Sequence, residues 1–133
     1  MASREKIILG VAKDPAGAEV IAPVLGMLGE IESAGYMAVA QAHAVDIFKK
    51  HGISFIETSP ANKIELRTEA NAFLDRISPD VVITGTAKGP SIDKYIIEAC
   101  RRKNIPSITV LDCWINFRQR FSGENETEKF GFL

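Results

Sequence analysis

Residues 81–106 read VVITGTAKGPSIDKYIIEACRRKNIP and combine three signals of secondary structure in one stretch. It opens with an apolar run typical of a buried strand, breaks into a loop rich in glycine and hydroxyl groups, and continues as an amphipathic helix. The loop matches neither the Walker pattern GxxxxGK[ST] nor the dinucleotide pattern GxGxxG. The stretch therefore predicts a strand, a loop and a helix in direct succession, and it leaves open what the loop holds.

Strand-like and helix-like segments alternate along the rest of the chain. We expect strands at residues 6–12, 36–41, 53–57, 80–86 and 106–112, and helices in the stretch up to 33 and at residues 43–52, 64–77 and 91–104. Apolar strands separated by helices indicate a parallel sheet covered on both faces. Right-handed crossovers on both sides of the first strand then predict an α/β fold, a three-layer, doubly wound, five-stranded sheet of order 3-2-1-4-5 that is Rossmann-like.

Length and composition predict one domain and a soluble, cytoplasmic protein. The chain has 133 residues, 46% apolar and 25% charged, and its net charge of −1 gives no reason to expect nucleic acid or acidic lipid as a partner. No apolar run is long enough to span a membrane, and no signal peptide follows the N-terminus. Residues 1–121 are assigned to the α/β domain, and residues 122–133 to a polar tail or a linker to a missing domain.

Helix-end signals are strong in one helix and conflicting in another. Ser91 stands at an N-cap position, Asp93 places a carboxylate in the first turn, and residues 101–103 are basic. Pro23 falls inside the first expected helix, so that helix should either be kinked there or begin late, near Ile21.

Two glycine-bearing loops are expected to meet where the strand order reverses, between the first and fourth strands. They are AKDPAGAE, residues 12–19, and GTAKGPSI, residues 85–92, and each leads into a helix N-terminus that attracts anions. A phosphate or a sugar hydroxyl suits that chemistry. The ligand-binding candidates in the two loops are Asp14, Gly17, Gly85, Thr86, Lys88, Gly89 and Ser91. The alternative is structural, because glycine and serine also serve sharp turns and caps.

A third segment, LDCWINFRQRF at residues 111–121, leaves the last strand on the same side. Its candidates Asp112, Trp114 and Asn116 combine groups that stack on and hydrogen-bond to a polar ligand, although a lone Trp beside apolar residues more often packs against the sheet edge. His43 and His51 are expected at the surface, no metal site or cofactor is predicted, and the two cysteines are expected to be free thiols.

The order of these motifs resembles the N-terminal Rossmann-like domain of GT-B-type glycosyltransferases and their relatives, among them UDP-N-acetylglucosamine 2-epimerase and lipid A disaccharide synthase. The resemblance is carried by AKDPAGAEVIAPVL at residues 12–25 and by residues 81–121. It implies an enzyme of two such domains, in which the N-terminal one faces the acceptor and the other holds most of the nucleotide-sugar donor. This sequence has no second domain, so we expect a piece of a longer protein or a half that works with a partner.

Two function classes therefore stay open. One is the acceptor-side half of a glycosyltransferase-like or epimerase-like enzyme, with a sugar-phosphate or nucleotide-sugar ligand and with catalytic residues unknown. The other is a stand-alone ligand-binding or protein-interaction module, and a flavodoxin-like flavin or nucleotide binder is a weaker third. Aromatic and apolar residues at 114–121 and 130–133 predict an interface with a second copy, giving a homodimer, or with a missing C-terminal domain. A frayed tail is the alternative.

Overall fold

The structure is a computed structural model, and it describes residues 5–111 and 120–121. The expected tail or linker, residues 122–133, lies outside the described residues. So do the site candidates Asp112, Trp114 and Asn116 and most of the aromatic segment 114–121.

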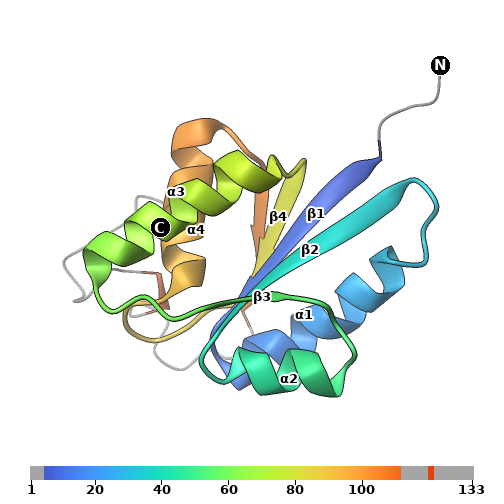
Figure 1. Ribbon diagram of the computed structural model, residues 1–133, viewed down its shortest axis with the longest axis horizontal. Helices are drawn as coiled ribbons and strands as arrows, with labels where there is room; N and C mark the ends of the chain where they lie inside the picture. Colours follow the sequence, from blue (N-terminus) through green and yellow to red (C-terminus); the bar gives the residue numbers. More distant parts are fainter. Residues whose placement is uncertain (1–4, 112–119, 122–133) are drawn as a thin grey trace.

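One parallel sheet organises the described chain, with the strand order β3-β2-β1-β4-β5 that the sequence predicts. Its strands are β1 (Lys6–Ala12), β2 (Ala34–Gln41), β3 (Ile56–Thr58), β4 (Val81–Thr84) and β5 (Ser107–Thr109). The helices are α1 (Pro15–Leu28), α2 (Ala44–Lys50), α3 (Lys63–Ile77) and α4 (Ile92–Lys103). Figure 1 shows the sheet at the centre, with α1 and α2 on one face and α3 and α4 on the other. The fold is the three-layer, doubly wound α/β sandwich.

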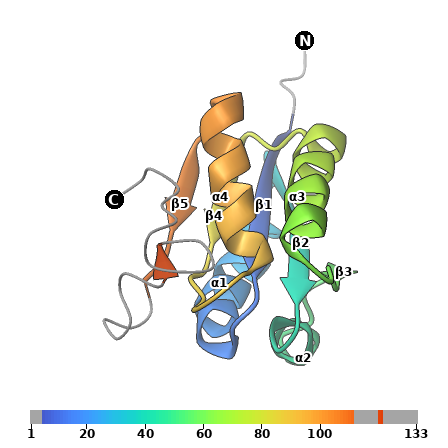
Figure 2. The same ribbon diagram turned by 90° about the vertical axis from the view of Figure 1, so that its left-hand side faces the viewer.

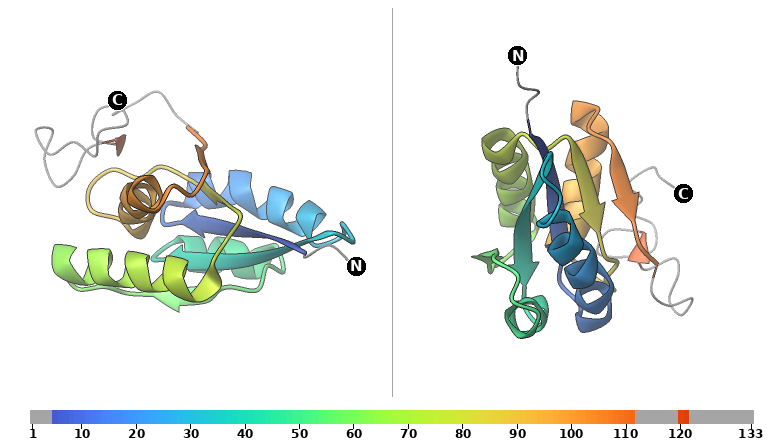
Figure 3. Two further views of the ribbon diagram at one scale, coloured as in Figure 1. Left: turned by 90° about the horizontal axis from the view of Figure 1, so that it is seen from above. Right: turned by 90° about the vertical axis from the view of Figure 1, so that its right-hand side faces the viewer.

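The two faces of the sheet are packed with side chains of different size. On the α3 and α4 face, Leu9 and Val11 of β1 belong to a cluster of large buried side chains. On the α1 and α2 face, Ala38 and Ala40 of β2 meet helix side chains directly. At Gly10 an added Cβ would lie 2.6 Å from a methyl carbon of Leu25 in α1. Small strand residues therefore let α1 lie close to the sheet. Figure 2 and Figure 3 show the sheet and its covering helices from other sides.

The first helix differs from the expectation at both ends. It begins at Pro15 rather than near Ile21 and ends at Leu28 rather than continuing to residue 33. Proline suits a first helical position, because that position needs no N–H donor and proline fixes φ at a helical value. Pro23 lies on the exposed side of the helix, where water can replace the backbone hydrogen bond that proline removes. Of the two alternatives that Pro23 left open, the late start near Ile21 is therefore wrong, since Pro23 lies inside the helix.

Three strands are shorter or shifted relative to the prediction. The strand expected at 53–57 occurs at Ile56–Thr58, and that expected at 106–112 occurs at Ser107–Thr109. The fourth strand ends at Thr84, two residues early, so Gly85 and Thr86 belong to the loop that follows.

Helix α3 starts with a side-chain cap. The Oδ1 atom of Asn62 accepts a hydrogen bond from the backbone N–H of Glu65 at 2.9 Å, and the Glu65 carboxylate accepts one from the N–H of Ala61 at 2.6 Å. The two bonds satisfy two donors around the start of the helix and fix where α3 begins.

We predict that Asn62→Ala lowers the free energy of unfolding by about 1 kcal/mol, because it removes the acceptor at the start of α3. Asn62→Asp is the control, since its carboxylate keeps that acceptor. Urea unfolding followed by circular dichroism measures both variants. Equal losses in the two variants would show that the cap bond does not stabilise the helix.

Candidate functional site

Two loops meet at the carboxyl end of the sheet, where β1 and β4 lie side by side. The Nζ atom of Lys13 donates a hydrogen bond to the carbonyl oxygen of Pro90 across 2.9 Å. The backbones of Gly17 and Gly85 also touch, since a Cβ added to Gly17 would lie 3.1 Å from the Cα of Gly85. Ligands of such folds collect at the topological switch point. There, the start of α1 and the loop after β4 are thus in direct contact through their backbones.

This contact accounts for two of the candidate glycines by packing. A Cβ at Gly85 would lie 3.0 Å from the Cα of Gly17, and a backbone atom cannot move aside as a flexible side chain can. Gly89 differs, because its φ of +80° lies in the region that favours glycine, and a Cβ added there would have no atom within 4 Å. Direct contact of these glycines with a ligand stays a prediction.

A residue beyond β5 reaches the loop that follows β4. The Nη1 atom of Arg120 donates to the carbonyl oxygen of Thr86 at 3.3 Å and to its Oγ1 atom at 2.9 Å. Next to this loop, the hydroxyls of Thr84, the last residue of β4, and Thr109, the last residue of β5, lie 3.1 Å apart and link the two strands. Thr86 is buried, so its hydroxyl is held by protein groups. Arg120 therefore lies at the same end of the sheet as the two loops.

The N-terminus of α4 is filled by acceptors from the protein itself. Ser91 occupies the N-cap position, but its hydroxyl bonds to the Oδ1 atom of Asp93 and does not cap the helix. That Oδ1 atom also accepts the N–H of Lys94 at 2.8 Å. The Oε1 atom of Gln41, at the end of β2, accepts the N–H of Ile92 at 2.9 Å. Side chains from two elements thus replace the cap that the sequence assigns to Ser91.

Asp93 is a buried carboxyl group with an incomplete set of hydrogen bonds. Its residue surface is 1% exposed, and its Oδ2 atom has no hydrogen-bond partner among the described residues. Burial raises the pKa of Asp93 to about 6, against the hydrogen bonds from Ser91 and from the Lys94 N–H, which lower it. The nearby Asp14 carboxylate raises it slightly further. Asp93 therefore changes charge near neutral pH.

Lys94 is buried beside it. Burial lowers the pKa of the Lys94 ammonium to about 8, and the Asp93 carboxylate acts in the opposite direction. Lys13 and Arg120 lower it further by repulsion. Charges of both signs from both loops, from α4 and from the segment after β5 therefore act on one another at the switch point.

The remaining candidates surround this cluster. Asp14 is the N-cap residue of α1 and is half-buried, but its side chain makes no capping bond. Lys88 is exposed on the loop after β4. The structure thus brings Gly17 against Gly85 and Ser91 against Asp93, places Lys88 and Gly89 on the loop after β4, and leaves the role of all seven candidates in ligand binding a prediction.

Gln41 and Lys94 were not predicted as site residues, and Asp93 was expected only to favour the helix dipole. A place for Gln41 in the site could have been predicted, because this residue ends a strand next to the switch point. Lys94 gave no signal, because a lysine in the first turn of an amphipathic helix normally lies in water.

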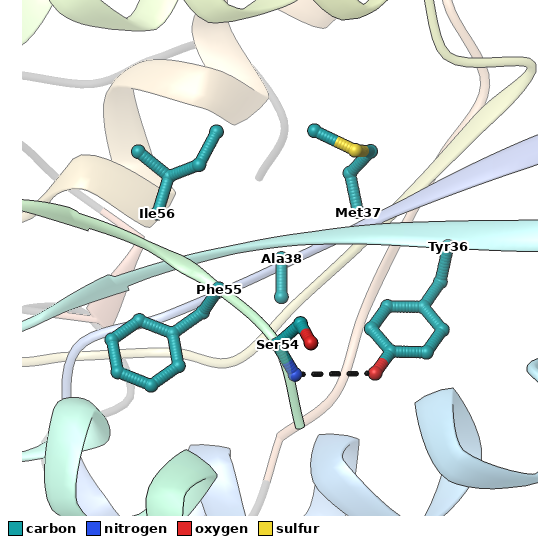
Figure 4. A pocket seen from close by; sticks show the side chains of 6 residues that line it. All are labelled: Tyr36, Met37, Ala38, Ser54, Phe55 and Ile56. Atoms are coloured by element: carbon teal, nitrogen blue, oxygen red, sulfur yellow. Dashed lines mark hydrogen bonds between the residues drawn. The ribbon is translucent and has the colours of Figure 1, made fainter. Parts of the chain in front are cut away.

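The pocket drawn in Figure 4 lies elsewhere, between β2 and the segment before β3. Its volume is about 160 Å³, and its lining residues are Tyr36, Met37, Ala38, Ser54, Phe55 and Ile56. β2 and β3 pair only from Val39 onward, and before that point the Tyr36 hydroxyl accepts the N–H of Ser54 at 3.2 Å. The pocket is the gap that this divergence leaves, and it lies away from the two loops.

Two further features were sought in the described part of the chain. Residues 5–111 and 120–121 contain no group of three or more His, Cys, Asp or Glu side chains that could hold a metal ion. None of the four helices in these ranges is both long and apolar enough to cross a bilayer.

Comparison with solved structures shows where this fold occurs. The UDP-GlcNAc 2-epimerase of Neisseria meningitidis bound to UDP-GlcNAc matches 78% of this chain at 15% identity and a TM-score of 0.65. The MnaA protein of S. aureus in a structure with UDP matches 79% at 15% identity and a TM-score of 0.67. The glycosyltransferase of kitacinnamycin matches 86% at 13% identity and a TM-score of 0.54. The chain therefore has a Rossmann-like domain of the type found in these enzymes, as the resemblance implies.

The match covers only part of each of these solved proteins. The chain spans about a third of these proteins, from 30% to 32% of their length. At this level of identity the likeness shows the fold alone. No protein-family model matches the sequence, and no curated protein matches it either.

We predict opposite effects for two glycine-to-alanine changes in α1. Gly17→Ala should lower the free energy of unfolding by about 1–3 kcal/mol, because the new methyl group meets the backbone of Gly85. Gly26→Ala should raise it by about 0.5–1 kcal/mol, since its Cβ meets only a side-chain methyl of Ile53 at 3.9 Å and alanine favours the helix. Urea unfolding distinguishes them. If Gly17→Ala is as stable as Gly26→Ala, the contact between the loops is not tight.

We predict that Asp93→Asn alters stability in a pH-dependent way. The folded pKa near 6 exceeds the ordinary value of 3.8, so the native state binds more protons between these values, and the stability of the parent protein falls as the pH rises through them. The amide keeps the Oδ1 acceptor and carries no charge. The variant should match the parent near pH 3.5 and exceed it by up to about 3 kcal/mol above pH 6. A stability difference that stays constant from pH 4 to 7 would contradict the raised pKa.

Proposed function

We propose that the switch point binds a sugar or phosphate group and that the chain supplies the acceptor-side half of a sugar-nucleotide epimerase-like or glycosyltransferase-like enzyme. The fold supports this proposal, because solved structures of the same fold include an epimerase bound to UDP-GlcNAc and a protein bound to UDP. The location supports it as well, since ligands of doubly wound sheets bind outside the carboxyl ends of the strands.

One observation carries the proposal: the Oδ2 atom of Asp93 is buried at the switch point and has no hydrogen-bond partner in the described part of the chain. Buried carboxylate oxygens nearly always have partners, because leaving them unpaired costs free energy. A hydroxyl group of a ligand would donate the missing bond. The shifted pKa values of two buried neighbours, Asp93 and Lys94, also favour a functional site over a purely structural one.

The arrangement of charges favours a sugar hydroxyl at Asp93 over a phosphate. The N–H groups of Ile92 and Lys94 already bond to Gln41 and Asp93, so they are not available to an anion at the start of α4. Asp14 adds a second carboxylate nearby. A phosphate group would instead approach the cations of the loops, for which Lys13 and Lys88 are the candidates. We therefore assign the sugar part of the ligand to Asp93.

A second candidate function is a stand-alone interaction module. It is favoured by apolar side chains on the outside of α1, where Val20, Val24 and Met27 expose 41%, 38% and 70% of their surface. The two functions are compatible, because that surface and the switch point involve different residues.

The test is an NMR titration with UDP-GlcNAc, UDP and inorganic phosphate. We expect UDP-GlcNAc to shift the amide signals of residues 13–17 and 85–94, and phosphate alone to leave those of residues 92–94 unchanged. Asp93→Asn should weaken UDP-GlcNAc binding by at least about tenfold, because a buried ligand hydroxyl would lose a charged acceptor. Asp46→Asn, which changes an exposed carboxylate in α2, is the matched control.

Shifts confined to another surface would contradict the assigned site. We also expect no epimerisation or glycosyl transfer from the chain by itself, because reaction in such enzymes takes two domains. Robust turnover by the purified chain would overturn its assignment as one half of an enzyme.

A further inference from the structure

The side chain of Gln41 reaches from the end of β2 to the start of α4. Side chains alternate between the two faces along a strand, so Gln41 lies on the same face as Val39, which packs in the cluster under α3 and α4. Its Oε1 atom accepts the N–H of Ile92, the first residue of α4, at 2.9 Å. A side chain from another element thus satisfies one of the N–H groups that a helix start leaves without a partner.

Ser91 is thereby relieved of the role that its position gives it. At an N-cap, a serine hydroxyl ordinarily accepts an N–H of the first helical turn, and Ser91 makes no such bond. The N–H of Lys94 bonds instead to the Oδ1 atom of Asp93 at 2.8 Å. The Ser91 hydroxyl acts as a donor and bonds to the same Oδ1 atom. Because Ser91 and Asp93 are 0% and 1% exposed, water does not compete for either bond.

The two oxygen atoms of the Asp93 carboxyl group are therefore held unequally. Oδ1 accepts two hydrogen bonds, one from the Ser91 hydroxyl and one from the Lys94 N–H. Oδ2 is buried as well, but it has no hydrogen-bond partner among residues 5–111 and 120–121. Two donors at one oxygen fix the orientation of a planar carboxyl group. The position of Oδ2 is thus determined entirely through the other oxygen.

Capping of the helix does not by itself require this arrangement. If Ser91 accepted the Lys94 N–H, an uncharged residue could stand at position 93, and no carboxyl group would need to be buried. Burial of a carboxyl group with one oxygen unpaired costs free energy. Hydrogen bonds that converge on Oδ1 at this cost indicate a role for Oδ2.

We propose that Gln41 and Ser91 are positioning residues: Gln41 caps α4 in place of Ser91, and the Ser91 hydroxyl fixes the Asp93 carboxylate so that its Oδ2 atom accepts a hydrogen bond from a ligand hydroxyl. The proposal rests on the function proposed for the switch point. It gives Ser91 a role behind the ligand-binding carboxylate, in place of the direct ligand contact expected from the sequence.

The titration of Asp93 is a measure of the Ser91 bond. Burial raises the pKa of Asp93, and the hydrogen bond from Ser91 is the largest of the influences that lower it. Charged groups of the neighbouring elements also act here: Lys94 and Asp14 on Asp93, and Lys13 and Arg120 on Lys94. A neutral substitution at Ser91 or Gln41 leaves all these charges in place, so a changed titration reports the altered hydrogen bonds.

The test follows the ¹³C chemical shift of the Asp93 carboxyl group against pH in the full 133-residue chain without ligand. We expect the parent protein to titrate near pH 6. Ser91→Ala should move the midpoint upward by about one pH unit, because the charged carboxylate loses a donor. Ser91→Thr keeps the hydroxyl and should retain the parent midpoint. Ser59→Ala, at an exposed serine after β3, is the matched control and should leave it unchanged.

A double-mutant cycle tests the part of Gln41. Gln41→Met keeps the length of the side chain and removes the amide acceptor, so the Ser91 hydroxyl is drawn to cap the helix and leaves Asp93. This variant should also raise the midpoint, and the double variant should titrate like Ser91→Ala alone, because both changes act through one bond. Shifts that add in the double variant would overturn the link between Gln41 and Ser91. Circular dichroism checks that each variant is folded.

Binding of UDP-GlcNAc to the same variants separates this proposal from the proposed function. At pH 8, where Asp93 is ionised, Ser91→Ala should raise the dissociation constant about three- to tenfold, because the carboxylate is no longer held in place. If the midpoints move as expected and the parent protein does not bind UDP-GlcNAc, the positioning is confirmed and the assigned ligand is wrong. If UDP-GlcNAc binds and Ser91→Ala keeps both the midpoint and the affinity of the parent, the positioning is overturned and the proposed function stands.

Discussion

The contact between Gly17 and Gly85 is the constraint on which the arrangement of the carboxyl end depends. Because neither residue has a Cβ, the start of α1 lies directly on the loop after β4, with 3.1 Å between an added Cβ and the facing Cα. The contact sets where β4 ends and holds Lys13 within reach of Pro90. The start of α4, where Asp93 is buried, is therefore positioned by a contact between two glycine backbones.

The contact between Gly17 and Gly85 has a consequence for binding. A ligand at the switch point cannot pass between α1 and the loop after β4, so it approaches from outside the ends of the strands. Groups from four parts of the chain act on one another at that end: Lys13 and Asp14, Thr86, Asp93 and Lys94, and Arg120. Among these described groups, Asp93 has a buried carboxylate oxygen without a hydrogen-bond partner. The proposed site is therefore centred on Asp93 rather than on the glycines of the two loops.

The sequence predicted the larger features of the fold well, because apolar periodicity and the handedness of crossovers determine them. Strand number and order follow from these two rules. Element ends were less predictable, since they depend on contacts between distant residues: β4 stops at Thr84 where Gly85 meets α1, and α1 begins at Pro15 despite Pro23. The two loops of the site could be located in advance. The burial of Asp93 and Lys94 could not, because a charged residue in a first helical turn is normally solvated and only the neighbouring elements exclude water here.

The unequal packing of the two sheet faces bears on how this domain can change in evolution. On the α3 and α4 face, large side chains such as Leu9 and Val11 can exchange volume with their neighbours, because each gain can be offset by a loss nearby. Under α1, Gly10, Ala38 and Ala40 are already at or near the smallest size, and a Cβ at Gly10 would lie 2.6 Å from Leu25. Mutational drift should therefore be asymmetric, with the α1 face accepting few substitutions and the opposite face many.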